Sequence, residues 1–249
     1  MGQLDGKTAV VTGGTTGIGL AAAKRLAEHG AHVFIIGRRP EQVTAAVAAI
    51  GPDATGVTGD VTSDADLDRL YDAVRERGRG LDVLFANAGG GELAPLGQIT
   101  PEHFDTTFGL NVKALLFTVQ KALPLLNDPA SVVLCGSTAG SAGQASFSVY
   151  GATKAAVRSL ARSWAAELSG RGVRVNTLSP GPIETPGLSG LVADEQQAQQ
   201  FKQELIRQVP LDRMGRPEEV ADAVLFLASG QSSFITGAEL FVDGGMNQV

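Results

Sequence analysis

The sequence predicts an α/β protein built on an open, doubly wound parallel sheet with helices on both faces. Short β-rich runs alternate with longer amphipathic stretches along the chain, and such alternation is typical of parallel sheets. Several of the short runs are almost entirely apolar, as expected for strands that helices cover on both faces. A glycine-rich turn directly follows the first run, where a sheet of this kind places a phosphate site.

Seven runs are predicted as strands: Thr8–Val11, His32–Ile36, Ala54–Thr58, Val83–Ala86, Val132–Cys135, Val173–Leu178 and Leu240–Val242. The stretches between them that are predicted as helices include Leu20–His29, Asp64–Arg77, Phe104–Leu126, Val149–Leu168 and Pro217–Leu227. Seven strands fit an open sheet better than a closed barrel of about eight. We expect residues 1–249 to form a single domain, in which the irregular segment Pro186–Pro210 is either a mobile lid or an exposed helix.

Composition excludes several classes of function. The net charge of −6 and the lack of any basic run argue against nucleic acid or an anionic membrane as the main partner. The single cysteine, Cys135, cannot form an internal disulfide, and the three histidines show no metal-ligand spacing, so no metal site is predicted. Neither a secretory signal pattern nor an apolar run long enough to span a bilayer is present. We expect a cytoplasmic protein.

A glycine-rich turn links the first predicted strand to the first predicted helix. Glycines let a backbone approach a pyrophosphate closely, and the helix N-terminus offers N–H donors to it. The spacing G-x-x-x-G-x-G is wider than the G-x-G-x-x-G dinucleotide fingerprint, and a turn without a ligand can also be rich in glycine. Because this turn opens a βαβ unit, we predict phosphate contacts from Gly13, Thr15, Thr16, Gly17, Ile18 and Gly19.

Tyr150 and Lys154 lie four residues apart and therefore share one face of a predicted helix. A free tyrosine ionises at about pH 10, and a nearby ammonium stabilises the phenolate, so the pair suits proton exchange near neutral pH. A bare Y-x-x-x-K also occurs by chance in many proteins. Ser137 strengthens the motif, because it follows a predicted strand at the sheet edge that faces the ligand crevice. There it can donate to a substrate oxygen or merely cap a loop.

With these residues the chain resembles the classical short-chain dehydrogenase/reductase family over essentially its whole length, from Gly6-Lys7 to Asp243-Gly244-Gly245. That family has a Rossmann-like fold and uses the wider glycine spacing. The resemblance implies an NAD(P)-dependent oxidoreductase that moves a hydride between the nicotinamide and a carbonyl or secondary alcohol carbon. It also implies a homotetramer.

The resemblance assigns four catalytic roles. Tyr150 exchanges a proton with the substrate oxygen, Ser137 orients that oxygen, and Lys154 tunes the tyrosine while it holds the nicotinamide ribose. Asn111 would bind a water molecule that relays protons toward the lysine, although a polar residue inside an apolar helix is usually a satisfied core amide. Further cofactor contacts are implied at Asp60, Val61, Asn87, Ala88, Gly89, Pro180, Gly181, Ile183 and Thr185.

The end of the second predicted strand bears on the choice of cofactor. NAD sites place an acid there that binds the ribose hydroxyls, but this chain has Gly37 at that position. Arg38 and Arg39 follow, and an arginine fork pairs well with the 2′-phosphate of NADP. The sequence therefore favours NADP(H). If both arginines are simply solvated at a helix start, NAD(H) remains open.

The loops expected to contact substrate are mostly small and apolar, namely Gly90–Leu93, Ala139–Phe147 with the polar Gln144, and Gly187–Phe201. They favour an apolar carbonyl compound. One alternative is 3-oxoacyl-[acyl-carrier-protein] reductase, although Asn127–Ala130 lacks the basic residues that an acidic partner requires, leaving Arg171 and Arg174. A second alternative, from another class, is a catalytically idle NADP-binding sensor or scaffold. Such a protein is expected to lack a catalytic residue, but Ser137, Tyr150 and Lys154 are all present in this sequence.

Overall fold

The structure is a computed structural model that describes residues 2–189 and 195–249. The described residues form one parallel sheet of seven strands, in the order β3-β2-β1-β4-β5-β6-β7. The strands are β1 (Thr8–Thr12), β2 (His32–Gly37), β3 (Ala54–Thr58), β4 (Leu81–Ala86), β5 (Leu126–Cys135), β6 (Arg174–Pro180) and β7 (Glu239–Val242). All seven predicted strands are confirmed. The largest difference is in β5, which begins at Leu126 rather than Val132.

The strand order fixes where a ligand crevice can form. The chain begins in the middle of the sheet with β1, runs outward to β3, then returns to β4 beside β1 and continues outward to β7. Loops leave β1 and β4 toward opposite faces at this reversal, which opens a crevice outside the carboxyl ends of the strands. The predicted phosphate turn follows β1, so the fold places it at the crevice.

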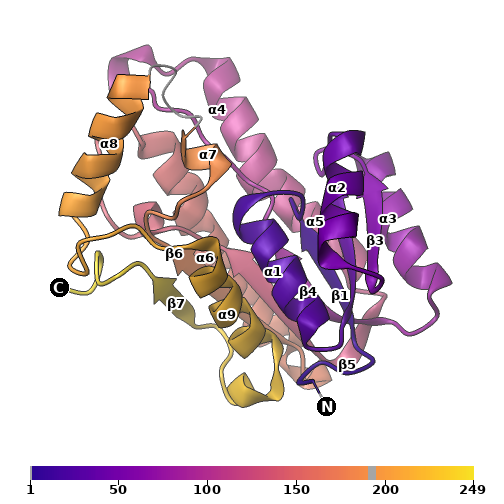
Figure 1. The fold of residues 1–249 in the computed structure, drawn as a ribbon. Helices are drawn as coiled ribbons and strands as arrows, with labels where there is room; N and C mark the ends of the chain where they lie inside the picture. Colours follow the sequence, from indigo (N-terminus) through magenta and orange to yellow (C-terminus); the bar gives the residue numbers. More distant parts are fainter. Residues whose placement is uncertain (1, 190–194) are drawn as a thin grey trace.

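Helices cover both faces of the sheet (Figure 1). They are α1 (Gly17–Glu28), α2 (Pro40–Ile50), α3 (Asp64–Glu76), α4 (Pro101–Phe108), α5 (Leu115–Ala122), α6 (Ser148–Leu168), α7 (Pro186–Ser189), α8 (Glu195–Arg207) and α9 (Pro217–Ala228). One core cluster lies between the sheet and α1, α2 and α9, and the other lies between the sheet and α3, α5 and α6. Within the described part of the chain, no helix combines the length and apolarity needed to cross a membrane.

The apolar strands reflect this two-sided burial. Successive side chains on a strand point to opposite faces, so Val10 packs in the cluster beneath α3, α5 and α6 while Ala9 and Val11 pack beneath α1 and α9. All five residues of β1 are buried. A polar residue at any alternate position would therefore lie under a helix, which explains why the run lacks the alternation of a half-exposed strand.

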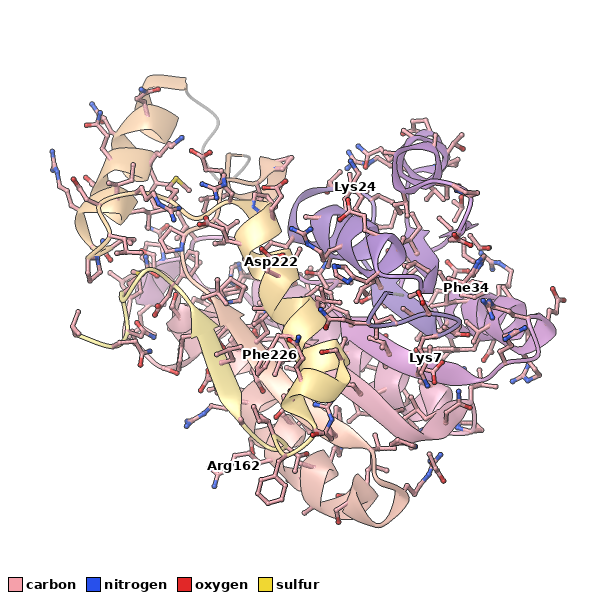
Figure 2. All side chains as sticks on the ribbon, turned by 60° about the horizontal axis from the view of Figure 1, so that its bottom comes forward. Lys7, Lys24, Phe34, Arg162, Asp222 and Phe226 are labelled. Carbon is pink, nitrogen blue, oxygen red and sulfur yellow. The ribbon has the colours of Figure 1, made fainter. Side chains whose placement is uncertain are left out.

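Helices α1 and α9 pack side by side on one face, and Figure 2 shows α9 with Asp222 and Phe226 labelled. Small residues on α1, Ala22 and Ala23, are fully buried and allow the two helices to approach closely. At the exposed rim of this contact the Arg25 Nε lies 2.7 Å from the Asp222 carboxylate. Helix α1, which begins in the glycine-rich turn, is thus joined directly to α9 near the other end of the chain.

The predicted helix Phe104–Leu126 is wrong in extent and continuity. Helix α4 begins earlier, at Pro101, because Thr100 caps it by accepting a hydrogen bond from the His103 N–H. A π-helical segment, η2 (Gly109–Ala114), then leads to α5, which ends at Ala122, and Leu126 already belongs to β5. A π turn differs from an α-helix in its i→i+5 hydrogen bonds and here spans only six residues, so the sequence pattern alone could not reveal it.

The segment Pro186–Pro210 contains α7 and α8, so it includes a helix at Glu195–Arg207, while movement as a lid stays a prediction. Residues 190–194 of this segment lie outside the described residues. Leu205 on α8 is buried, and Phe201 is half-buried. Helix α8 therefore turns apolar side chains inward, toward the carboxyl ends of the strands.

Glu219 gives the fold a testable pH dependence. Its carboxylate accepts hydrogen bonds of 2.9 and 2.6 Å from Arg213 and one of 2.7 Å from the Arg216 N–H at the start of α9. The Arg213 hydrogen bond, followed by that of the Arg216 backbone, lowers the pKa of Glu219 from 4.5 to about 2. A carboxyl whose pKa is lower in the folded state stabilises the fold above its unfolded pKa.

We therefore expect Glu219→Gln to lower the midpoint of thermal unfolding at pH 7. The difference from the unsubstituted protein should shrink as the pH falls from about 4.5 toward 2, the interval between the two pKa values. Thermal unfolding followed by circular dichroism at several pH values measures this. An exposed carboxylate outside this contact, Glu218→Gln, serves as the control. A Glu219→Gln effect that is constant between pH 7 and pH 3 would contradict the assignment.

Candidate functional site

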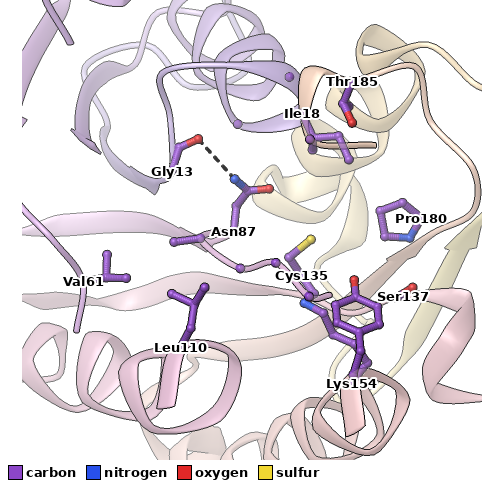
Figure 3. Close-up of a pocket in the computed structure, with 18 of the residues that line it drawn as sticks. Gly13, Ile18, Val61, Asn87, Leu110, Cys135, Ser137, Lys154, Pro180 and Thr185 are labelled. Carbon is purple, nitrogen blue, oxygen red and sulfur yellow. Dashed lines mark hydrogen bonds between the residues drawn. The ribbon is translucent and has the colours of Figure 1, made fainter. Parts of the chain in front are cut away.

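A cleft of about 1020 Å³ lies at the carboxyl ends of the strands. The loops that follow β1 to β6 all contribute to its lining. Because of the strand order, the loops after β2 and β3 line one side of the reversal and those after β5 and β6 line the other. The cleft therefore brings together nearly every candidate residue that the sequence singled out, and Figure 3 shows part of it.

The glycine-rich turn has the conformation that its sequence requires. Gly13 and Gly17 have φ values of +63° and +53°, which favour glycine. A Cβ on Gly19 would collide with the Gly13 carbonyl oxygen, and one on Gly17 would lie 3.2 Å from the Thr185 side chain. The turn is thus closed tightly on itself, with Thr15, Thr16 and Ile18 also lining the cleft and α1 beginning at Gly17.

Thr12 and Asn87 lock the turn to the end of β4. The Thr12 hydroxyl accepts hydrogen bonds of 3.0 Å from the backbone N–H groups of Asn87 and Ala88. In return the Asn87 side-chain amide donates to the carbonyls of Thr12, at 3.0 Å, and Gly13, at 3.4 Å (Figure 3). The Asn87 amide therefore supports the backbone of the turn, while Ala88 and Gly89 line the cleft beside it. Thr12 is a supporting residue that the sequence analysis missed.

The end of β2 is shaped by a side chain from the glycine-rich turn. A Cβ at Gly37 would lie 2.5 Å from the Thr15 methyl carbon, so a larger residue cannot occupy this position without displacing Thr15. The next two residues, Arg38 and Arg39, are exposed and line the cleft. Among the described residues neither arginine has an ion-pair partner within 4.0 Å, so both guanidinium groups are available to an anionic ligand.

Asp60 and Val61 line the same side of the cleft after β3. One oxygen of the Asp60 carboxylate accepts hydrogen bonds from the Thr62 N–H, at 2.9 Å, and the Thr62 hydroxyl, at 2.8 Å. The Asp60 N–H donates to the Asp66 carboxylate at 2.7 Å. These bonds fix the loop, while the largely buried Val61 provides an apolar surface toward the cleft.

Tyr150 and Lys154 share the inner face of α6. Lys154 is only 5% exposed. Its Nζ donates a 2.8 Å hydrogen bond to the Cys135 carbonyl, and the same Nζ lies 5.6 Å from the centroid of the Tyr150 ring. Phe147 packs edge-to-face on the same ring, at 5.2 Å between centroids. A Cβ at Gly91 would lie 2.5 Å from the Tyr150 ring, so the phenol is held between a glycine and an aromatic ring.

Ser137 follows β5 in the cleft, and its hydroxyl oxygen accepts a 3.2 Å hydrogen bond from the Ala139 N–H. This bond caps the short helix η3 (Thr138–Gly140), so the loop-cap interpretation holds. In this hydrogen bond the Ser137 oxygen is the acceptor, so the hydroxyl hydrogen does not take part in it. Ser137 can therefore cap the loop and donate to a ligand at the same time.

Asn111 lies in the π-helical segment η2 and is almost fully buried. Its amide pairs with the backbone of Gly90: the side-chain oxygen accepts from the Gly90 N–H at 3.0 Å, and the side-chain nitrogen donates to the Gly90 carbonyl at 2.7 Å. A Cβ at Gly89 would lie 2.8 Å from the Asn111 oxygen and 3.4 Å from Lys154 Nζ. Asn111 and Lys154 therefore flank the same glycine.

The loop after β6 is built from backbone contacts. Gly181 donates to the Val242 carbonyl at 3.0 Å, and Ile183 forms a parallel bridge with Gly215. The Thr185 hydroxyl accepts from the Leu188 N–H at 3.2 Å, at the start of α7. Gly181, Ile183 and Thr185 line the cleft, together with Pro180.

A carboxylate whose side chain is only 9% exposed ties α6 to the strands beside this loop. Glu239 on β7 accepts a 2.7 Å hydrogen bond from the Ser179 hydroxyl on β6 and lies 2.6 Å from Arg158 Nε on α6. Arg158 is one helical turn beyond Lys154 and two beyond Tyr150, on the same side of α6. The bridge therefore fixes α6 relative to the ends of β6 and β7.

The substrate-loop expectation needs two corrections. Ala142 and Ala145 are exposed and do not line the cleft, because the loop Ala139–Phe147 turns only Ala139, Gln144 and Phe147 inward. Two apolar residues that the sequence analysis missed, Leu205 and Met246, do line it. Leu205 lies on the apolar side of α8, a spacing signal visible in the sequence, whereas Met246 lies in an irregular turn that has none.

Arg171 and Arg174 are engaged within the protein. The Arg171 guanidinium donates to the Leu123 and Leu126 carbonyls and to Asp128. Arg174 donates to carbonyls of Leu227, Ser229 and Ile235 and to the Ser232 hydroxyl, and burial lowers its pKa. Their roles in the fold are structural. Over residues 2–189 and 195–249, no cluster of three or more metal-ligating side chains is present.

The comparisons with known proteins agree with this geometry. A family model described as enoyl-(acyl carrier protein) reductase matches residues 13–247. The oxidoreductase asL5 of Sarocladium schorii is 52% identical, over 99% of this chain and 98% of that protein. The cis-4-hydroxycyclohexanecarboxylate dehydrogenase of Sinomonas cyclohexanicum is 38% identical, over 98% of this chain and 97% of that protein.

A solved structure extends the likeness to three dimensions. A variant of a Serratia marcescens short-chain dehydrogenase/reductase superimposes with a TM-score of 0.90 at 30% identity, covering 98% of this chain and 99% of that chain. The family match and both sequence relatives also span nearly the whole chain. The chain therefore belongs to the short-chain dehydrogenase/reductase family, the oxidoreductases that act on alcohol and carbonyl groups with a nicotinamide cofactor.

Proposed function

We propose that the protein transfers a hydride between NADP(H) and an apolar carbonyl compound or secondary alcohol. The observation that carries this proposal is the convergence of Ser137, Tyr150 and Lys154 in one cleft, with the buried ammonium of Lys154 5.6 Å from the Tyr150 ring. The proposal that the substrate is apolar rests on the hydrophobic residues that line the same cleft, among them Phe147 and Leu188.

The residues of the glycine-rich turn fit a dinucleotide. Glycine is required at three of its positions, either because φ is positive or because a Cβ would collide with backbone. The turn precedes the N-terminus of α1, which favours an anionic phosphate. We propose that Gly13, Thr15, Thr16, Gly17, Ile18 and Gly19 hold the phosphates, with Asp60, Val61, Ala88 and Gly89 along the nucleotide and Pro180, Gly181, Ile183 and Thr185 beside the nicotinamide.

When bound, the nicotinamide supplies or accepts the hydride. In reduction, the Tyr150 hydroxyl donates its proton to the substrate oxygen, and in oxidation the phenolate removes it. The Ser137 hydroxyl donates a hydrogen bond to the same oxygen and so holds it beside Tyr150. The Lys154 ammonium stabilises the phenolate by its charge. Asn111 stays in the proton relay as a proposal, because its side-chain oxygen and Lys154 Nζ flank Gly89.

Two observations support NADP(H) over NAD(H). Gly37 cannot carry the ribose-binding acid without displacing Thr15. Arg38 and Arg39 reach the same part of the cleft without an ion-pair partner among the described residues. A guanidinium matches the 2′-phosphate in charge and in the geometry of its donors.

The two alternatives are weaker. A 3-oxoacyl-[acyl-carrier-protein] reductase needs a basic surface for its acidic partner, and the arginines considered for that role, Arg171 and Arg174, are committed to internal acceptors. An idle sensor or scaffold has no need for the buried lysine beside Tyr150. It would bind NADPH tightly yet reduce no member of a broad carbonyl panel.

We also propose a homotetramer. Phe234 is fully exposed, and Phe104, which stacks on Phe108, is 44% exposed. These apolar side chains lie on separate parts of the surface, beyond α9 and on α4. Strand β7 is an edge strand whose outer side offers free backbone groups to a second copy.

The first test concerns the turn. Gly19→Ala should weaken NADPH binding more than about tenfold, a loss of about 1.4 kcal/mol, because the new methyl group collides with the Gly13 carbonyl and forces the turn open. Fluorescence titration with NADPH measures the affinity, and thermal unfolding verifies that the variant folds. Gly170→Ala, where a Cβ meets open space, is the matched control. Unchanged affinity in a folded Gly19→Ala protein would exclude this turn as the phosphate site.

The second test concerns the cofactor. Arg38→Ala and Arg39→Ala together should raise the dissociation constant of NADPH by about tenfold or more, or about 1.4 kcal/mol, and leave that of NADH within about twofold. The control is Arg162→Ala, an exposed arginine on α6 outside the cleft lining. Equal losses for both nucleotides, or NADH binding as tightly as NADPH to the unsubstituted protein, would contradict the preference for NADP(H).

The third test concerns catalysis. Tyr150→Phe should lower NADPH-dependent reduction of a panel containing acetophenone, cyclohexanone and 2-octanone by about 100- to 10,000-fold, because it removes the proton donor. NADPH affinity should stay within about twofold. Tyr71→Phe is the matched control, since Tyr71 is buried outside the cleft and its hydroxyl only donates to the Thr118 carbonyl. Full turnover by Tyr150→Phe would refute the proposed role.

A further inference from the structure

The residues that follow β7 form a fixed turn that returns to the cleft. In this C-terminal turn, Asp243–Asn247, the buried Asp243 carboxylate accepts hydrogen bonds of 2.9 Å from the Gly245 and Asn247 N–H groups. Gly244 and Gly245 have φ values of +64° and +93°, a region that favours glycine. The carboxylate thus holds the turn from within, and the two glycines allow its sharp reversal.

Three neighbouring segments hold the C-terminal turn from outside. Asn247 donates its side-chain amide to the Thr138 carbonyl at 3.0 Å, immediately after Ser137. Gly181, in the loop after β6, packs so closely that a Cβ there would lie 2.8 Å from the Asp243 Cα. On a third side, the Leu211 N–H donates to the Gly244 carbonyl at 3.2 Å, just beyond α8. The turn therefore joins the Ser137 loop, the loop after β6 and the chain that leaves α8.

Met246 is the residue of this turn that lines the cleft. Both its neighbours are fixed by Asp243, so its backbone has little freedom to withdraw. Phe201 and Leu205 on α8, together with Leu188 on α7, line the cleft as well. Met246 thus adds a flexible, unbranched side chain to an otherwise bulky apolar wall.

We propose that Met246 is a specificity-determining residue that contacts the apolar substituent of the substrate carbonyl and limits its size. The inference rests on the proposed function, because it takes an apolar ketone or alcohol as the substrate. Since the turn is bonded to the Thr138 carbonyl beside Ser137, the position of this wall is fixed relative to the group that orients the substrate oxygen. A change in side-chain volume at residue 246 therefore changes the space beside the reacting carbon.

The first experiment detects the contact without requiring turnover. The chain has three methionines, Met1, Met214 and Met246, so labelling with methyl-¹³C-methionine gives a simple NMR spectrum, and Met246→Leu identifies one resonance. Acetophenone or 2-octanone is added to protein saturated with NADP⁺. The Met246 methyl resonance should shift, while that of Met214, which is buried and outside the cleft lining, should not.

The second experiment measures specificity. Met246→Ala should change the ratio of kcat/KM for 2-octanone to that for 2-butanone by about tenfold in favour of the longer ketone, the scale expected for apolar contacts in a pocket. NADPH affinity should stay unchanged. Val249→Ala, at an almost fully exposed terminal position, is the matched control.

The outcomes separate the inference from the proposed function. If the protein reduces ketones but the Met246 resonance stays in place and Met246→Ala leaves the ratio unchanged, the inference is wrong and the proposed function stands. If ketones shift the Met246 resonance but are never reduced, the contact stands and the proposed reaction fails. If no ketone binds, as judged by saturation transfer to the ketone protons, or is reduced, the apolar substrate class is wrong and the inference fails with it.

Discussion

The candidate site depends on one buried positive charge. Lys154 lies under the cleft at 5% exposure, and an ammonium removed from water is strongly unfavourable unless acceptors and polarisable groups surround it. The Cys135 carbonyl and the Tyr150 ring supply part of that environment. Burial of the Lys154 ammonium therefore constrains how β5, α6 and the Gly89 backbone are placed relative to one another. The Glu239 bridge to Arg158 adds a second, independent constraint on the same helix.

The arrangement also shows how one loop can serve structure and chemistry together. The side chains of Asn87 and Thr12 form hydrogen bonds with backbone groups. The residues beside them in the cleft lining are glycines and an alanine. Small residues at this surface let a flat ring or a phosphate approach the main chain. The polar side chains that remain directed at a ligand are few, and their placement, rather than their number, sets what the cleft can bind.

Sequence patterns predicted the sheet, the tight glycine-rich turn after β1 and the shared helix face of Tyr150 and Lys154, because each depends on local spacing. Apolar runs predict buried strands, glycines predict where the backbone turns tightly, and an interval of four residues predicts that two side chains share a helix face. The π segment around Asn111 escaped prediction because a change of hydrogen bonding over six residues is too short to leave a clear periodicity in the sequence. The contacts of Gly37 with Thr15 and of Asn247 with Thr138 join residues far apart in the chain, so no local pattern encodes them. The seven strands and most residues of the cleft lining could thus be predicted from the sequence, whereas the long-range contacts that fix the walls of the cleft could not.

The C-terminal turn has a consequence for how the protein is made and handled. Strand β7 and the turn after it leave the ribosome later than β1 to β6, yet they complete a cleft whose other walls follow those earlier strands. During synthesis the sheet edge and the cleft therefore stay unfinished until β7 and residues 243–247 have emerged. The two ends of the sheet differ in the same respect. Thr8, at the start of β1, lies at the edge of the sheet opposite the cleft, whereas Met246 lines the cleft, so a fusion ahead of β1 disturbs the site less than one placed directly after Met246.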